Sequence, residues 1–140
     1  MINVSNSLEV LPYELKLVEG FNRGDVSVSD HVFHSDAVIH INGNPNKDLS
    51  LEEFKQMVTG VLIAFPDLQF TIEDQFASGN KISTRWTAEG TNSGPLGELN
   101  PTGKRVKLDG IIIDYLKNEK VSERWELWDQ MSMLQQLGIM

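Results

Sequence analysis

The spacing of apolar residues changes its period along the chain, and this change most restricts the possible folds. Up to Phe65 apolar residues recur every three or four positions, as on one face of a helix, and from Leu68 they alternate with polar residues, as in a strand. Helices are therefore expected first and strands after them. That order favours an α+β fold with a sheet laid over the helices and disfavours parallel βαβ units.

The first half of the chain predicts two longer helices with a short strand between them. Residues 50–53 (SLEE) form a capping box, and helical spacing continues from there until Pro66. A short helical turn is predicted at residues 29–35 and a short β-branched strand at residues 37–41. The earlier helix follows Asn6 and Ser7, although Pro12 leaves its start open, and its apolar stripe consists of Leu8, Leu11, Leu15 and Val18.

The second half predicts antiparallel strands joined by turns. Leu68, Phe70 and Ile72 share one face of a strand, and residues 78–81 (SGNK) indicate a hairpin turn. Asp74 falls where that face continues, which we interpret as a β-bulge rather than a buried acid. The remaining predicted elements are strands at residues 82–91, 106–116 and 121–129, a loop at residues 92–103, and a short helix after residue 129.

Length, charge and composition exclude several classes of protein. A chain of 140 residues is expected to form one domain, residues 1–140. Twelve basic and twenty acidic residues give a net charge of −8, so neither nucleic acid nor an anionic membrane is expected as a partner. The absence of cysteine excludes disulfides and thiol nucleophiles. The longest apolar run, residues 61–65, is too short to span a bilayer and no secretory signal is evident, so a cytoplasmic protein is expected.

The last predicted strand places a carboxylate after a run of alternating apolar residues. By simple alternation Trp125, Leu127 and Asp129 share one face. If that face lines an interior, poor solvation would raise the pKa of Asp129 toward neutrality and make it a general acid/base. The structural alternative is that Asp129 caps the helix that begins near Gln130, and spacing alone favours the cap.

Four further residues are candidates for ligand contacts, and three of them have a structural alternative. Trp86 belongs to a residue type that walls ligand cavities but equally packs in cores, and Asp114 is either partly enclosed by the sheet or on an exposed face. His40 either hydrogen-bonds a substrate carbonyl or is a satisfied structural histidine. Trp125 shares the predicted face of Asp129 and would line the same wall.

The motifs do not favour a metal, a nucleotide cofactor or a serine nucleophile. His31 and His34 lie near Asp30 and Asp36, but the segment is short and no larger ligand set is evident. The sequence has neither a phosphate-binding glycine motif nor a Gly-x-Ser-x-Gly motif. Carboxylate acid/base chemistry without a cofactor is therefore the best catalytic hypothesis.

Several segments, taken together and in order, resemble the SnoaL-like polyketide cyclases. They lie between about residue 36 and the C-terminus, and comprise residues 65–68 (FPDL), 85–91 (RWTAEGT), 100–106 (NPTGKRV), 123–129 (ERWELWD) and 134–138 (LQQLG). The resemblance implies the cone-shaped α+β fold shared with nuclear transport factor 2, ketosteroid isomerase and limonene epoxide hydrolase, in which a curved antiparallel sheet and helices enclose an apolar pocket. Related folds commonly dimerise through the sheet, so a homodimer is expected.

The resemblance also implies a reaction. Characterised cyclases of this family close a ring by intramolecular aldol condensation, without metal or cofactor, using an aspartate that removes a carbon-bound proton and protonates the carbonyl. We match Asp129 to that acid/base, with His40, Trp86, Asp114 and Trp125 lining the pocket around a small apolar carbonyl compound. This role requires that Asp129 stand beside an apolar, water-poor hollow.

Two positions depart from the family's pattern, and other functions stay open. Many relatives read Gly-Thr-His where this chain has residues 90–92 (GTN), and Leu127 is apolar where a cyclase can carry a polar partner. The alternatives to a cyclase are a non-catalytic ligand-binding dimer, with Arg124, Glu126 and Trp128 at its interface, or a hydratase, dehydratase or isomerase of the same fold. The last group needs a second polar group opposite Asp129.

Overall fold

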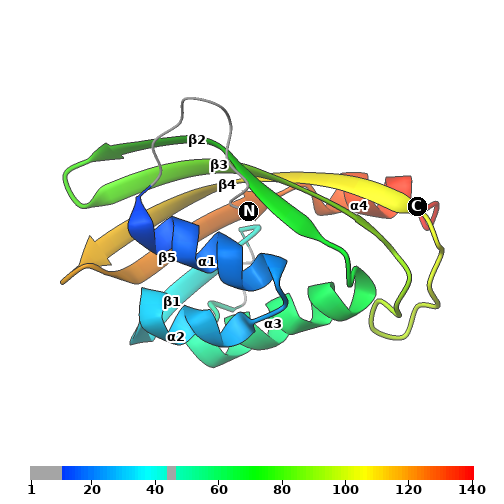
Figure 1. The fold of residues 1–140 in the computed structure, drawn as a ribbon, viewed down its shortest axis with the longest axis horizontal. Coiled ribbons are helices and arrows are strands. Elements are labelled where there is room, and N and C mark those ends of the chain that lie inside the picture. The colour runs from blue at the N-terminus through cyan, green and yellow to red at the C-terminus, as the bar shows by residue number, and fades with distance from the viewer. Residues whose placement is uncertain (1–10, 44–46) are drawn as a thin grey trace.

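The computed structural model describes residues 11–43 and 47–140, which form helices beneath one curved sheet (Figure 1). The helices are α1 (Pro12–Asn22), α2 (Ser29–Val32), α3 (Leu51–Ala64) and α4 (Gln130–Gln136), with a 3₁₀ helix at Val26–Val28. The strands are β1 (Phe33–Ile41), β2 (Gln69–Ser78), β3 (Lys81–Thr91), β4 (Arg105–Lys117) and β5 (Lys120–Trp128). Their order in the sheet is β1-β5-β4-β3-β2, and the predicted α+β class is confirmed.

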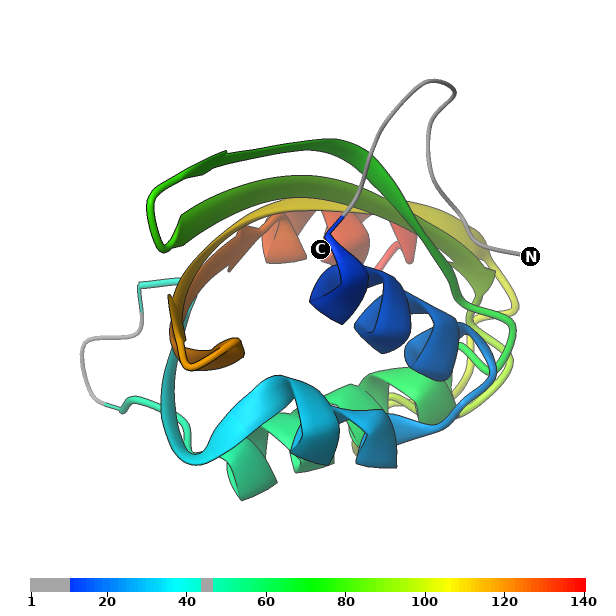
Figure 2. The ribbon, with the colours of Figure 1, turned by 60° about the vertical axis from the view of Figure 1, so that its left-hand side comes forward.

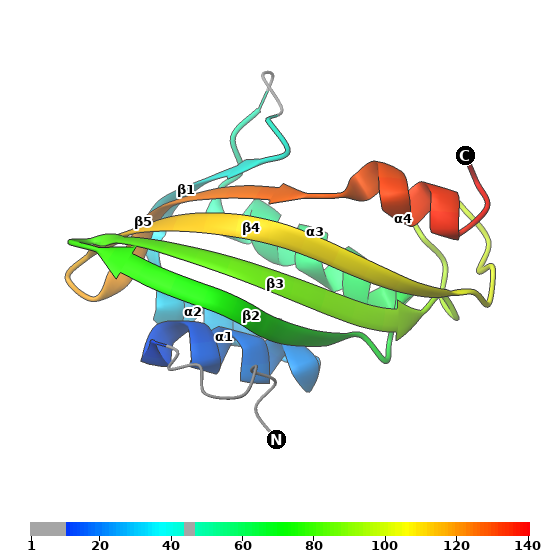
Figure 3. The same ribbon diagram turned by 90° about the horizontal axis from the view of Figure 1, so that it is seen from above.

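The sheet has a concave and a convex face. Figure 2 shows the strands curving around α1 and α3, and Figure 3 shows α4 continuing from the end of β5. We call the concave face, which covers α1 and α3, the inner face, and the opposite face the outer face. Buried apolar residues gather under the inner face in two clusters, one containing Phe33 and Phe54 and the other containing Trp86 and Leu137.

Within residues 11–43 and 47–140 no helix is long and apolar enough to cross a membrane.

Local signals explain where the helices begin. The capping box is confirmed, because the Ser50 hydroxyl accepts from the Glu53 backbone N–H at 3.2 Å and the Glu53 carboxylate accepts from the Ser50 backbone N–H at 3.1 Å. Pro12 is the first residue of α1, where its missing N–H and fixed φ cost nothing. Leu8 of the predicted stripe, and Asn6 and Ser7 before it, lie outside the described residues.

The antiparallel strands follow the predicted pattern. The β2–β3 hairpin turns at Gly79, whose φ is +61°, and the β4–β5 turn places Asn118 and Glu119 at positive φ. The bulge predicted at Asp74 is confirmed, because the β2–β3 register shifts between Ile72 and Asp74.

Strand β1 differs from its prediction in length and in partner. It begins at Phe33 rather than at residue 37, and it pairs in parallel with β5, so that His40 lies opposite Trp125. The other three strand pairs are antiparallel. Paired residues of β1 and β5 are 85 to 88 positions apart in the sequence, and no local pattern predicts that pairing.

Candidate functional site

A cavity of about 80 Å³ lies between the helices α1 and α3 and the inner face of the sheet. Most of its wall is apolar and includes the side chains of Leu17, Phe54, Val58, Trp86 and Ile112. Its polar part consists of Glu14 from α1 with Arg124 and Glu126 from β5. An apolar cavity with a few convergent polar groups is the usual form of a small-molecule site, so we take this inner cavity as the candidate functional site.

Arg124 is the centre of a buried ionic cluster at the polar part of the cavity. Its guanidinium binds Asp114 in a bidentate manner, with Nε 2.7 Å from Oδ1 and Nη2 2.8 Å from Oδ2. Nη2 also donates to Glu14 Oε2 at 3.2 Å, and the Tyr13 hydroxyl donates to Asp114 Oδ2 at 2.8 Å. Arg124 is 2% exposed and Asp114 fully buried, so this cluster ties α1 to the sheet away from solvent.

Glu126 stands at the edge of this cluster and is less firmly held than the other two carboxylates. Its Oε1 lies 3.7 Å from Arg124 Nη1, and its side chain is 10% exposed. Burial raises the pKa of Glu126 to about 7, although Arg124 acts in the opposite direction. Burial likewise raises the pKa of Glu14 to about 7, but Glu14 accepts a hydrogen bond from Arg124. Glu126 is therefore the carboxyl group of the cavity best able to exchange a proton near neutral pH.

The expectation that Asp129 lies in a poorly solvated interior is wrong. Asp129 is exposed at the N-terminus of α4, where its Oδ1 accepts from the Ser132 backbone N–H at 2.9 Å. It does not line the inner cavity. The capping alternative is therefore confirmed. The catalytic role of Asp129 stays a prediction, and the hollow that Asp129 borders lies on the outer face, where its side chain is exposed.

One extra residue in β5 explains the error. Tyr115 pairs with Glu123 and Leu116 with Val121, which leaves Ser122 as a bulge. Beyond the bulge the alternation is inverted, so Arg124 faces inward and Trp125 is 47% exposed. Glu126 and Trp128 line the inner cavity and also border a hollow on the outer face, and their role at a dimer interface stays a prediction.

The other predicted site residues divide between the two faces of the sheet. Trp86 lines the inner cavity, and Asp114 lies behind the cavity wall as a partner of Arg124. His40 and Trp125 stack on the outer face, with ring centroids 3.7 Å apart, beside a second hollow of about 560 Å³ that Asp129 also lines. The proposed grouping of His40, Trp125 and Asp129 with Trp86 in one pocket is therefore wrong.

His40 is held by two carboxylates. Its Nδ1 lies 2.7 Å from Asp48 Oδ1 and its Nε2 2.7 Å from Glu123 Oε2. Partial burial lowers the pKa of His40, but these two hydrogen bonds outweigh it and raise the pKa overall. The structural alternative given for this histidine is thus the one that the contacts support.

Asn92, where the resemblance led us to compare the chain with a family histidine, makes structural contacts. Its Nδ2 donates to the carbonyl oxygens of Ala64 and Gly94 at 3.1 and 2.9 Å, and its Oδ1 accepts from the backbone N–H and the hydroxyl of Thr102. Asn92 is 1% exposed and does not line the inner cavity. It ties the loop after β3 to the end of α3.

Sequence reasoning missed Glu14 and misplaced Arg124 and Glu126. One signal for Glu14 was present, because Glu14, Leu17 and Phe21 follow one another at helical spacing and all three are buried.

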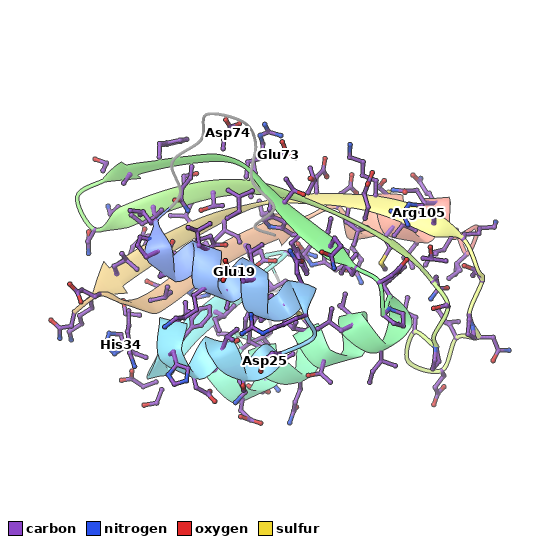
Figure 4. The ribbon with its side chains drawn as sticks, viewed as in Figure 1. Glu19, Asp25, His34, Glu73, Asp74 and Arg105 are labelled. Atoms are coloured by element: carbon purple, nitrogen blue, oxygen red, sulfur yellow. The ribbon has the colours of Figure 1, made fainter. Side chains whose placement is uncertain are left out.

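Other charged side chains lie outside the cavity. Figure 4 shows Asp74 and Arg105 on the outside of the fold. Asp74 pairs there with Arg85, and Arg105 pairs with Asp67 and Glu89.

Comparisons with known proteins show the family and agree with the fold. A family model described as SnoaL-like polyketide cyclase matches residues 14–137. AclR, a candidate hydroxylase from Streptomyces galilaeus, is 27% identical with a TM-score of 0.82, over 91% of this chain and 83% of that one. IdmH, a candidate polyketide cyclase from Streptomyces antibioticus, is 27% identical with a TM-score of 0.79, over 90% and 96%. A comparison with curated proteins gave no match.

Proposed function

The chain belongs to the SnoaL-like polyketide cyclase family, and on that basis we propose that it is a cofactor-independent acid/base enzyme acting on a small apolar carbonyl compound. The inner cavity would hold this compound, and its volume of about 80 Å³ favours a compact one. The reaction proposed is an intramolecular aldol condensation.

Glu126 is the residue that we propose for the proton transfers. Its carboxylate takes a proton from the carbon beside a carbonyl group, and the electron pair of that C–H bond moves toward the carbonyl oxygen. The resulting enolate carbon then forms a bond to a second carbonyl carbon of the same molecule, and the new alkoxide takes the proton back from the Glu126 carboxyl group. The carboxylate is regenerated, so no other reactant is needed.

One observation supports this choice above the others. The Glu126 carboxyl group lines an apolar cavity, has a pKa of about 7 because of burial, and contacts Arg124 only at 3.7 Å. A general base of this pKa is half ionised at neutral pH, which suits both steps of the reaction. Asp114 is fully engaged by Arg124 and Tyr13, and Asp129 is exposed.

The test is the exchange of carbon-bound protons of cyclopentanone for deuterium in D₂O, followed by NMR. We expect the protein to accelerate this exchange and Glu126→Gln to reduce the acceleration by about 10²- to 10⁴-fold, the usual contribution of a general base. Asp129→Asn is the matched control, since asparagine can keep the helix cap. Loss of exchange in Asp129→Asn with full activity in Glu126→Gln would return the role to Asp129.

A non-catalytic function makes a different prediction. A protein that only stores or carries its ligand would bind cyclopentanone in the cavity without accelerating exchange. A hydratase, dehydratase or isomerase would use Glu126 in the same cavity and would still catalyse exchange wherever its reaction passes through an enolate.

We also propose a homodimer that forms through the outer face of the sheet. Four exposed apolar side chains lie together there on β4 and β5: Ile111, Ile113, Trp125 and Leu127, between 41% and 63% exposed. Burial of such a patch is the usual driving force for association. Sedimentation is expected to show a dimer that Leu127→Glu dissociates and that Ile63→Glu, on α3, leaves intact. A monomer at high concentration would contradict the proposal.

A cytoplasmic location, expected from the sequence, stays a prediction.

A further inference from the structure

One polar group of the inner cavity has no partner in the part of the chain that the structure describes. The Nε1–H of Trp86 is buried and makes no hydrogen bond among these residues. Trp86 as a whole is only 7% exposed. An indole N–H can only donate, and buried donors nearly always have an acceptor. The indole itself lines the inner cavity, so a bound molecule can supply the missing acceptor.

The position of this N–H is set by the residue opposite Trp86. Gly110 pairs with Trp86 across β3 and β4, and a Cβ atom at Gly110 would lie only 2.6 Å from the indole Cε2 and 2.5 Å from Cζ2. The indole edge therefore lies over β4, in the space that Gly110 leaves free. Since Nε1 is bonded to Cε2, the N–H belongs to the same edge of the ring as the atoms that lie over Gly110.

Trp86 and Glu126 thus come from neighbouring rows of the same face. Trp86, Gly110 and Trp128 form one cross-strand row, and Thr84, Ile112 and Glu126 form the next. Phe70 packs edge-on against the indole, with ring centroids 5.5 Å apart, and restricts its rotation. Both residues line the inner cavity, so one bound molecule can contact the two of them.

We propose that the Trp86 Nε1–H donates a hydrogen bond to the carbonyl oxygen of the bound molecule, which makes Trp86 a specificity-determining residue for ligands with an acceptor oxygen at that point. The proposal rests on the function proposed above. When Glu126 takes the proton from the neighbouring carbon, negative charge develops on that oxygen, and a donor already in place stabilises it. This is the second polar group that acid/base chemistry in this cavity needs.

The experiment compares two probes of the same shape, cyclopentanone and methylenecyclopentane, which has a CH₂ group in place of the oxygen. The protein contains three tryptophans, so its ¹⁵N spectrum has three indole N–H signals, and Trp86→Phe assigns one of them. Both probes are expected to shift the methyl signals of cavity residues such as Leu17 and Ile112. Only cyclopentanone is expected to move the Trp86 indole proton downfield.

Affinities give a second measurement. Trp86→Phe keeps an aromatic ring but removes the donor, so the preference for cyclopentanone over methylenecyclopentane is expected to fall by about threefold to tenfold, as for one neutral hydrogen bond. Trp125→Phe is the matched control, because it removes an indole N–H from the outer face and should leave the preference unchanged. If Trp86→Phe does not fold, Trp125→Phe and Trp128→Phe assign the other two indole signals, and the remaining signal of the unaltered protein still decides.

The outcomes separate this inference from the proposed function. Binding of both probes with no change at the Trp86 indole overturns the inference and leaves the cavity as a ligand site. Binding of neither probe overturns both. A downfield shift with cyclopentanone, but no exchange that depends on Glu126, supports the donor role and refutes the catalytic one.

Discussion

Replacing Glu126 by glutamine is expected to make the protein more stable at alkaline pH, although it removes the group proposed to perform the chemistry. Burial raises the pKa of this carboxyl group from 4.5 to about 7 in the folded protein. The folded state therefore holds the proton more tightly than the unfolded state, and stability falls as the pH rises from about 4.5 through about 7. Glutamine has no proton to lose, so the variant is free of this decrease.

The size of the effect follows from the same rise in pKa. At about 1.4 kcal/mol per pKa unit, the ionised Glu126 side chain costs the folded state about 3 kcal/mol above pH 8. Glu126 also raises the pKa of Glu14, so its replacement relieves Glu14 in the same direction. The advantage of Glu126→Gln over the unaltered protein should be small at pH 5 and reach about 3 kcal/mol by pH 8.

Urea unfolding at pH 5, 6, 7 and 8 measures this difference directly. Asp129→Asn serves as the control, because that side chain is exposed and lies outside the inner cavity, and asparagine can keep the helix cap. A constant difference between Glu126→Gln and the unaltered protein would refute the reasoning, because it would show that Glu126 titrates alike in the folded and unfolded states.

Three other substitutions test separate parts of the structure. Gly110→Ala places a Cβ atom 2.5 Å from Trp86 Cζ2 and should cost about 1–3 kcal/mol of stability in urea unfolding, as overpacked cores do. His40→Gln should destabilise the protein below pH 6.5, the ordinary pKa of histidine. The loss of stability relative to the unaltered protein should shrink as the pH rises through the higher pKa of His40 in the folded state. Urea unfolding of both proteins at pH 6 and at pH 9 measures this change. Ser50→Ala removes the cap of α3 and should cost about 1 kcal/mol in thermal or urea unfolding at either pH.

Much of the fold is readable in short stretches of the sequence. The capping box at Ser50 and Glu53, the hairpin at Gly79 and the bulge at Asp74 were all predicted, because each depends on residues that are neighbours in the chain. The cap formed by Asp129 was also among the alternatives, for the same reason. The pairing of β1 with β5 was missed, because it joins segments that only the curved sheet brings together.

The candidate site was predicted much less well than the fold. Trp125, Leu127 and Asp129 share one face as predicted, but it is the outer face, because the bulge at Ser122 puts Arg124 rather than Glu123 next to Val121 on the inner face. Asp129 therefore does not line the inner cavity, and Glu126 does. Glu14 and Arg124 are 110 positions apart, and nothing local indicates that they meet.

The amino-acid sequence by itself determined the succession of helices and strands and the family, since both depend on residue types at short, regular spacings. Only the tertiary structure decided which carboxyl group borders the inner cavity and which donor, that of Trp86, has no partner there among residues 11–43 and 47–140. Those properties come from burial and from one extra residue in the register of β5. A pKa is raised by burial, and a donor loses its water partner, only when distant parts of the chain fold together and exclude water.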